Sequence, residues 1–316
     1  GHLLESLEAF YDSSTTLPPV VRLDRLNETL RPLFRILGDS PGTILIPHGR
    51  LQLIPFELLA EDSAHNGPER RFSYLPGVHY LESVESGGAK TDPPHRFVSL
   101  WPSNKDAVPG AEREEEFFQT TFPGTRHLTL EELGPQGIRA AWIHLSGHFS
   151  FDPWLPLRSR FSDGEAGTEV LELLERPLSA RLLTIASCDI VNADRQTWSY
   201  WLGFSELFLQ NGARSIIASR WKLDEASVPL YTQLYELLQQ GLPPSEALGR
   251  ARETLANDLV HPFYWSGIVH IGPPETLENS DRPPEPETQR WFYHLNGLAI
   301  LFLLLTLLWS LQRRRG

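Results

Sequence analysis

One cysteine and one distant histidine are the residues of this chain whose types and spacing could support catalysis. Cys188 is the only cysteine in the sequence, and it ends an apolar run that begins at Ser179. His148 ends a similar apolar run that begins at Ala140. A thiol nucleophile is activated by a base, commonly a histidine that is distant in sequence but close in the fold. The pair therefore predicts nucleophilic chemistry at Cys188, with His148 as its base.

Both runs have the length and apolar content of short buried strands, and each delivers a reactive side chain at its carboxyl end. In an open sheet of parallel strands, ligands bind outside the carboxyl ends of the strands. We therefore expect Cys188 and His148 to lie at the same edge of one sheet. Taken singly, Cys188 would more often be an inert, small hydrophobic residue, and His148 an ordinary polar residue at a strand end.

A second histidine, His144, precedes His148 by four residues, which is the spacing of a zinc-binding pair on a helix. On a strand the two would share a face but lie about 13 Å apart. No acidic residue separates them, so we expect no metal site and a structural role for His144. The sequence also lacks a phosphate-binding glycine loop, and we expect no cofactor. The mostly acidic run 112–116 is interpreted as helix N-terminal charge and solvated surface.

Strand-like and helix-like segments alternate over residues 95–272, which predicts an α/β fold with a mostly parallel sheet flanked by helices on both faces. Residues 149–165, which follow the expected strand that ends at His148, are expected to form an irregular binding loop. The expected strands are 96–101, 126–130, 140–148, 179–188, 213–221 and 264–272, and the expected helices are 111–121, 130–139, 169–174, 198–210, 224–240 and 245–259.

Residues 1–85 are expected to form a smaller unit. Helical patterns span 3–11 and 23–37, and residues 43–53 have the pattern of a strand, a turn and a second strand. A flexible loop is expected at 86–94, where glycine and proline are frequent. The chain begins at Gly1 and contains no methionine, so we expect a fragment or a processed product with an upstream part missing.

The C-terminal region has the composition of a membrane anchor. Residues 273–290 form a Pro/Glu-rich linker, and residues 291–312 carry no formal charge. About 20 such residues cross a bilayer as a helix, so 291–312 predict a single-pass transmembrane segment. The basic tail 313–316 favours a cytoplasmic C-terminus, with the folded domain on the other side. A tail anchor holding a cytoplasmic domain is the alternative if no export signal precedes the chain.

Six motifs, in this order and spacing, resemble the caspase-like CHAT domains of bacteria and some eukaryotes, which are relatives of separase and caspases. The resemblance covers roughly residues 20–272. The motifs are 46–59 (IPHGRLQLIPFELL), 108–114 (VPGAERE), 144–148 (HLSGH), 185–188 (IASC), 208–221 (FLQNGARSIIASRW) and 261–272 (HPFYWSGIVHIG).

The resemblance implies a caspase-like fold and a cysteine endopeptidase. Cys188 would attack a peptide carbonyl, His148 would be the base, and the backbone N–H groups of Cys188 and Phe149 would hold the oxyanion. Related arginine-directed proteases use acidic groups to bind a basic residue, a role open to Asp189 or Asp163. Family members often carry tetratricopeptide repeats upstream, which would be a sensor region missing here.

Three features depart from the family pattern. His48 replaces the usual acidic residue of the first motif, a change expected to be structural. Phe149 follows His148 where many members carry glycine or alanine, and the segment 189–195 lacks the glycine-rich run common after the cysteine. A catalytically inactive interaction module of the same fold, tethered to a membrane, is therefore the main alternative, and a thiol acyl transferase is the third. The net charge of −12 argues against a nucleic-acid partner, so the expected partners are a protein or peptide substrate and the lipid bilayer.

Overall fold

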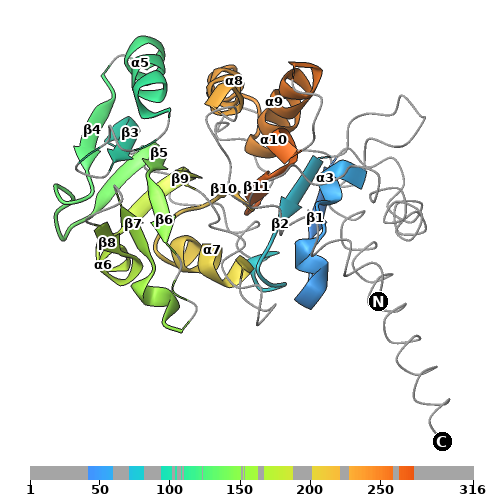
Figure 1. The fold of residues 1–316 in the computed structure, drawn as a ribbon, viewed down its shortest axis with the longest axis horizontal. Coiled ribbons are helices and arrows are strands. Elements are labelled where there is room, and N and C mark those ends of the chain that lie inside the picture. The colour runs from blue at the N-terminus through green and yellow to red at the C-terminus, as the bar shows by residue number, and fades with distance from the viewer. Residues whose placement is uncertain are drawn as a thin grey trace, which may run out of the picture. The chain divides into compact units, whose positions relative to one another are not determined.

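Figure 1 shows the computed structural model of the chain. It divides into two units, residues 1–277 and 278–316, and every residue that the structure describes belongs to the first. The described residues are 42–59, 71–81, 94–101, 104, 108, 110–122, 124–150, 152, 154–162, 167–187, 201–220, 228–258 and 263–273.

An eight-stranded sheet forms the middle layer of this unit, with the strand order β1-β2-β11-β10-β9-β5-β3-β4. Every neighbouring pair in this order is parallel except β10 and β11. The strands are β1 (Gly42–Leu45), β2 (Arg71–Tyr74), β3 (His95–Trp101), β4 (Arg126–Thr129), β5 (Ile138–Ser146), β9 (Leu178–Ala186), β10 (Ile216–Ser219) and β11 (Ile268–Ile271).

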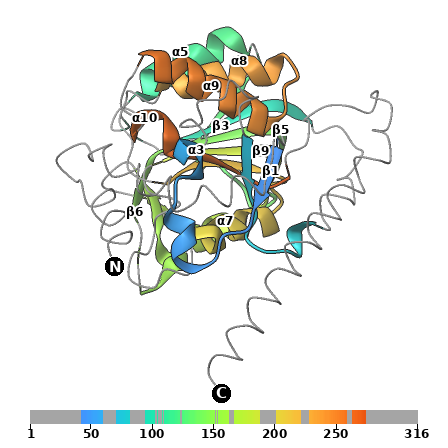
Figure 2. The same ribbon diagram turned by 90° about the vertical axis from the view of Figure 1, so that its right-hand side faces the viewer.

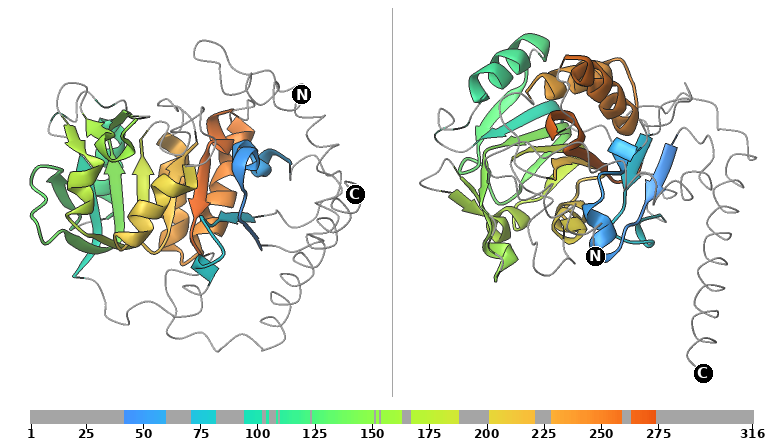
Figure 3. Two further views of the ribbon diagram at one scale, coloured as in Figure 1. Left: turned by 90° about the horizontal axis from the view of Figure 1, so that it is seen from below. Right: turned by 45° about the vertical axis from the view of Figure 1, so that its right-hand side comes forward.

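Helices cover both faces of the sheet (Figures 2 and 3). The helices α5 (Ala111–Thr121), α8 (Val228–Gln239) and α9 (Pro244–Asp258) pack on one face. The helices α6 (Val170–Leu174) and α7 (Trp201–Gln210) pack on the other. The remaining helical elements are the short η2 (Gly49–Leu53), α3 (Phe56–Leu59), η4 (Pro156–Arg158) and α10 (Phe263–Ser266).

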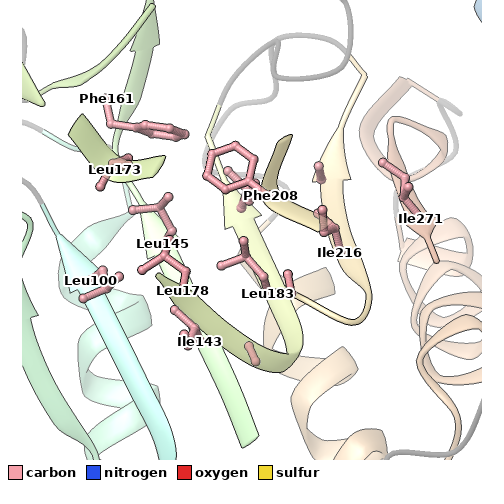
Figure 4. Packing of buried hydrophobic residues seen from close by; sticks show 14 of the residues in the cluster. Leu100, Ile143, Leu145, Phe161, Leu173, Leu178, Leu183, Phe208, Ile216 and Ile271 are labelled. Atoms are coloured by element: carbon pink, nitrogen blue, oxygen red, sulfur yellow. The ribbon is translucent and has the colours of Figure 1, made fainter. Parts of the chain in front are cut away.

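The core consists of two apolar layers, because neighbouring residues of a strand point to opposite faces of the sheet. On β5, Ile143 and Leu145 face the layer that contains Phe208 of α7 (Figure 4). Trp142 points the other way and packs against Tyr235 of α8. These side chains are buried, and removing their apolar surface from water on both faces is the main force that holds the layers together.

The mostly parallel sheet with helices on both faces confirms the predicted α/β class. The helix expected at 111–121 coincides with α5, and β3, β4, α6 and α9 lie within one residue of their expected bounds. The helix predicted at 130–139 is wrong, since the chain forms turns until β5 begins at Ile138. Gly137 explains this difference: its φ is +63°, and a Cβ there would lie 2.1 Å from the Pro177 carbonyl oxygen.

Two further expectations also need correction. Residues 49–53 form the 3-10 helix η2 rather than a second strand, and β1 instead pairs in parallel with β2. Pro47 is buried at the end of β1, and the glycine that follows at position 49 has a φ of +56°, which favours a turn into η2. The strand expected at 264–272 is shorter, because α10 precedes β11.

The stretch 149–165 is not simply an irregular loop. It contributes to a second, three-stranded antiparallel sheet in the order β6-β7-β8. These strands are β6 (His148–Ser150), β7 (Arg160–Ser162) and β8 (Gly167–Glu169).

Several predicted segments lie outside the described residues. They include the helices at 3–11 and 23–37, most of the 86–94 loop and nearly all of the 273–290 linker. The predicted membrane segment 291–312 and the basic tail 313–316 lie outside them as well. Within the described ranges, the structure has no helix that is both long and apolar enough to cross a membrane.

Candidate active site

The two strands that precede the candidate residues run side by side in the middle of the sheet. β5 and β9 are parallel, and their last paired residues are Ser146 and Ala186. Neighbouring strands lie about 4.8 Å apart. His148 and Cys188 each follow this last pair by two residues, although position 188 lies outside the described residues.

His148 also follows the strand at which the connections of the sheet change sides. After β3 the chain passes through α5 on one face of the sheet, whereas after β5 it passes through β6–β8 and α6 on the opposite face. Adjacent strands with connections on opposite faces leave a crevice outside their carboxyl ends, where open α/β sheets bind ligands. β3 and β5 are such a pair.

A glycine separates β5 from the strand that carries His148. Gly147 has a φ of +153°, a conformation that side chains disfavour, and this lets the chain leave the large sheet and enter β6. His148 begins β6 opposite Ser162, and it is half-buried. The next residue, Phe149, packs its ring 4.9 Å from the ring of Phe161. The histidine is therefore held on a short strand whose neighbouring side chain is anchored in the core.

A hydrogen bond fixes the chain immediately before Cys188. Ser219, the last residue of β10, donates its hydroxyl to the carbonyl oxygen of Ser187 at 2.5 Å. Ser187 and Ser219 are both buried. Ser187 is the last described residue of this segment, so the carbonyl group that precedes position 188 is tied to the neighbouring strand.

A buried polar cluster lies beneath the end of β5. It consists of Glu114, His144, Ser146 and Tyr235, and we call it the Glu114 cluster. His144 is fully buried, which agrees with the structural role expected for it. The interpretation of 112–116 as solvated surface is wrong for Glu114, which is 4 % exposed.

A second buried cluster lies at the end of β10, and we call it the Arg220 cluster. Arg220 donates to the carbonyl oxygens of Gln52 at 3.1 Å and Ile54 at 2.9 Å. The carboxylate of Glu57 lies 3.5 Å from Arg220 and 3.7 Å from Arg252. The guanidinium of Arg220 also lies over the ring of Tyr74, 4.7 Å from its centre. This cluster joins residues 46–59, the first of the family-like motifs, to the strand next to β9.

The loop between β6 and β7 carries exposed apolar residues. Asp152 accepts hydrogen bonds from the backbone N–H groups of Trp154 and Leu155, both at 2.9 Å. Trp154 is nevertheless 88 % exposed. These hydrogen bonds stabilise the backbone of the loop, while the side chain of Trp154 faces solvent.

Of the predicted site residues, His148 and Phe149 lie in the described part of the chain. Cys188, Asp189 and Asp163 lie outside it, so their roles stay predictions. The described residues contain no group of three or more potential metal ligands of the His, Cys, Asp and Glu types. Residues that the sequence pattern did not single out are Glu114, Ser146, Ser219 and Arg220.

Comparisons with known proteins identify a family. A family model for the CHAT domain matches residues 24–273. No protein with curated annotation matches the sequence. Two crystal structures of the Saccharomyces cerevisiae separase–securin complex, at 3.0 and 2.6 Å resolution, are similar to the chain, with TM-scores of 0.49 and 0.47 and identities of 13 % and 11 %. Each match covers 74 % of this chain but only 15 % and 16 % of the respective solved chain.

Proposed function

The chain belongs to the CHAT domain family, and from this premise we propose that it is a cysteine endopeptidase with Cys188 as nucleophile and His148 as base. The register between β5 and β9 carries the proposal. It ends on Ser146 and Ala186, and each candidate residue follows its strand by the same two positions. The fixed carbonyl of Ser187 supports it further, because a nucleophile must be held in place to attack.

In the proposed reaction, His148 takes the thiol proton and the thiolate of Cys188 attacks a peptide carbonyl carbon. The tetrahedral intermediate collapses, the peptide C–N bond breaks, and His148 returns the proton to the departing amine. Water then loses a proton to His148 and attacks the thioester. This releases the carboxylate product and restores the thiol.

Three further roles belong to this proposal. The backbone N–H groups of Phe149 and Cys188 hold the developing oxyanion, a role that any non-proline residue can fill. Asp189 or Asp163 binds a basic side chain before the cleaved bond, because a carboxylate is the natural partner of a guanidinium or ammonium group. The exposed Trp154 lies four residues after the end of β6 and would contact a peptide substrate.

The enzyme is proposed to act at a membrane, in signalling or defence. Residues 291–312 would anchor it as a single-pass helix, because their uncharged length suffices to span a bilayer. The proline-rich linker 273–290 would hold the catalytic unit away from the lipid. An upstream sensor region, such as tetratricopeptide repeats, would regulate it.

An inactive scaffold of the same fold is the second candidate. The observation in its favour is the segment 189–195, which lacks the glycine-rich run that the family commonly carries after its cysteine. A fold does not by itself guarantee chemistry. This candidate predicts an ordinary thiol at position 188 whose reactivity is independent of His148.

Alkylation of the thiol separates these candidates, because Cys188 is the only cysteine in the chain. The full chain would be purified in detergent and treated with iodoacetamide and with a thiol-reactive peptide ketone that contains arginine. Mass spectrometry would follow labelling of wild type, Cys188→Ala and His148→Ala. His95→Ala is the matched control, since His95 is also half-buried but lies at the amino end of β3.

A dyad predicts that His148→Ala slows labelling at pH 7 by about tenfold, because the thiolate fraction falls when its basic partner is lost. The His95→Ala variant should label like wild type, and Cys188→Ala should not label. Equal rates for wild type and His148→Ala would rule out the dyad. Labelling that depends on His148 without any cleavage of peptide substrates would instead favour the acyl transferase.

A further inference from the structure

A carboxylate is buried where the sequence pattern indicated surface. Glu114 lies in the first turns of α5, and its carboxylate faces the sheet rather than solvent. A buried carboxylate is strongly unfavourable unless hydrogen bonds or charges compensate it. The described partners of Glu114 come from β5, which is the strand that leads to His148.

The contacts of Glu114 form a continuous chain of hydrogen bonds. Its Oε2 atom accepts a hydrogen bond from the Ser146 hydroxyl at 3.2 Å and lies 3.1 Å from His144 Nε2. His144 Nδ1 lies 3.0 Å from the Tyr235 hydroxyl. Burial raises the pKa of Tyr235 well above its usual value, so this hydroxyl keeps its proton and can donate it to Nδ1. When His144 Nε2 donates to Glu114 and Nδ1 accepts from Tyr235, each of these contacts joins a donor to an acceptor.

This chain of bonds ties three elements together at one point. Glu114 comes from α5, Tyr235 from α8, and His144 and Ser146 from β5. The rings of Phe118 and Trp101 pack against His144 and close the cluster to water. The titratable groups that reach Glu114 in the described residues are thus His144 directly and Tyr235 through it.

Ser146 connects the cluster to the proposed active site. It is the last residue of β5, it is paired with Ala186 at the end of β9, and only Gly147 separates it from His148. We propose that Glu114 is a positioning residue, which fixes the end of β5 through Ser146 and thereby sets His148 against Cys188. This inference rests on the proposed function, since it gives Glu114 a role only if His148 activates the thiol.

The test removes the connection without removing the carboxylate. Ser146→Ala deletes the hydroxyl that binds Glu114, and Ser73→Ala is the matched control. Ser73 is equally buried and its hydroxyl lies 2.9 Å from the His270 ring, but it belongs to β2. β11, β10 and β9 separate that strand from β5. The readouts are the thermal midpoint and the rate of iodoacetamide alkylation between pH 5.5 and 9.

We expect Ser146→Ala to slow alkylation at pH 7 by about three- to tenfold, the equivalent of one lost hydrogen bond. We also expect it to move the midpoint of the rate–pH profile towards that of His148→Ala. Ser73→Ala should lower the thermal midpoint to a similar extent and leave the profile where it is in wild type. The positioning role requires this difference between the two variants.

Two results would overturn the inference in distinguishable ways. If Ser146→Ala has the wild-type rate and profile while His148→Ala is slow, the dyad stands and the positioning role fails. If His148→Ala itself labels like wild type, the proposed function fails, and the positioning role fails with it.

Discussion

Two fully buried histidines of the same sheet face charges of opposite sign. His144 on β5 lies 3.1 Å from the carboxylate of Glu114. His270 on β11 lies near Arg252, and burial together with that positive charge lowers the pKa of His270 to about 3. Both side chains are inaccessible to solvent. Both residues are equally buried, and they differ in the sign of the charge that lies beside each imidazole ring.

The Glu114 cluster, which contains His144, and the Arg220 cluster, whose Arg252 lies near His270, are also built differently. In the Glu114 cluster, side chains bond to side chains, and the bonds meet at the end of one strand. In the Arg220 cluster, two guanidinium groups share one carboxylate, and Arg220 and Arg252 also bond to backbone carbonyl oxygens. Backbone contacts join whole segments, so we expect the Arg220 cluster to govern stability. The Glu114 cluster should instead govern local geometry.

Loss of Arg220 should have the largest effect. Arg220→Met leaves the carbonyls of Gln52 and Ile54 without this donor, and among the described residues it leaves Glu57 with Arg252 as its guanidinium partner. We expect the free energy of unfolding to fall by about 3–5 kcal/mol, which is typical when one member of a buried ion pair is removed. Urea denaturation followed by circular dichroism would measure it.

The control for Arg220 is Arg250→Met. Arg250 is half-exposed and forms an ion pair with Glu246 at 2.8 Å within α9. Such surface pairs contribute less than about 1 kcal/mol. Equal losses in the two variants would contradict the view that the Arg220 cluster joins residues 46–59 to the sheet.

The next largest effect is the loss of folding stability that His270 causes as the pH falls. Because the folded-state pKa of His270 is about 3 and an unfolded histidine titrates near 6.5, the unfolded state binds more protons between these values. The contribution of His270 is fully present above about pH 6.5 and is lost as the pH falls. Wild type should lose on the order of 2 kcal/mol from this group between pH 7 and pH 5.

His270→Asn should remove the contribution of this histidine to the pH dependence of stability. The amide of the introduced asparagine could still form a hydrogen bond with the Ser73 hydroxyl, the present partner of the His270 ring. Urea denaturation at a series of pH values from 7 to 5 would show a flatter dependence in the variant. An unchanged slope would mean that His270 takes up a proton readily in the folded state, despite its burial and the nearby charge of Arg252.

On the other side of the comparison, Glu114→Gln should have a smaller effect on stability. The amide keeps the size of the side chain but is a weaker acceptor for Ser146 and His144. We expect a loss of about 1–2 kcal/mol, because the amide oxygen still accepts and only part of the roughly 1.5–3 kcal/mol of a hydrogen bond to a charged group is lost. Glu112→Gln, an exposed position of the same helix, should change stability by less than about 0.5 kcal/mol.

The elements that were predicted well have clear periodic patterns. α5 and α9 begin and end within one residue of expectation, and β9 was expected from its continuous apolar run. The three-residue strands β6, β7 and β8 are too short to show a period of two, so their sheet was missed. The alternation of Leu51 and Leu53 resembled a strand, but η2 places Leu51 at the surface.

The sequence did contain a signal for Glu114. The buried residues of α5 are Ala111, Glu114 and Phe118, which is the i, i+3, i+7 spacing of a helix face that packs on a core. A glutamate at the central position of that face is expected to be buried. The neighbouring glutamates of the run 112–116 made the whole run resemble solvated surface. Arg220 gave no comparable signal, because the residues that its side chain hydrogen-bonds, Gln52, Ile54 and Glu57, lie more than 160 residues away in sequence.

Arg252→Gln should give the smallest change in the pH dependence of the free energy of unfolding. This variant separates the effect of burial on His270 from the effect of the neighbouring charge. Burial is the larger cause of the lowered pKa of His270, and Arg252 is the smaller one. Removing the positive charge should therefore reduce the loss of stability between pH 7 and pH 5 by less than about 1 kcal/mol, while His270→Asn abolishes it. The neutral amide could still donate to the Ile268 carbonyl, which is one of the present partners of Arg252. If Arg252→Gln flattened the curve as fully as His270→Asn, the neighbouring charge rather than burial would keep His270 neutral.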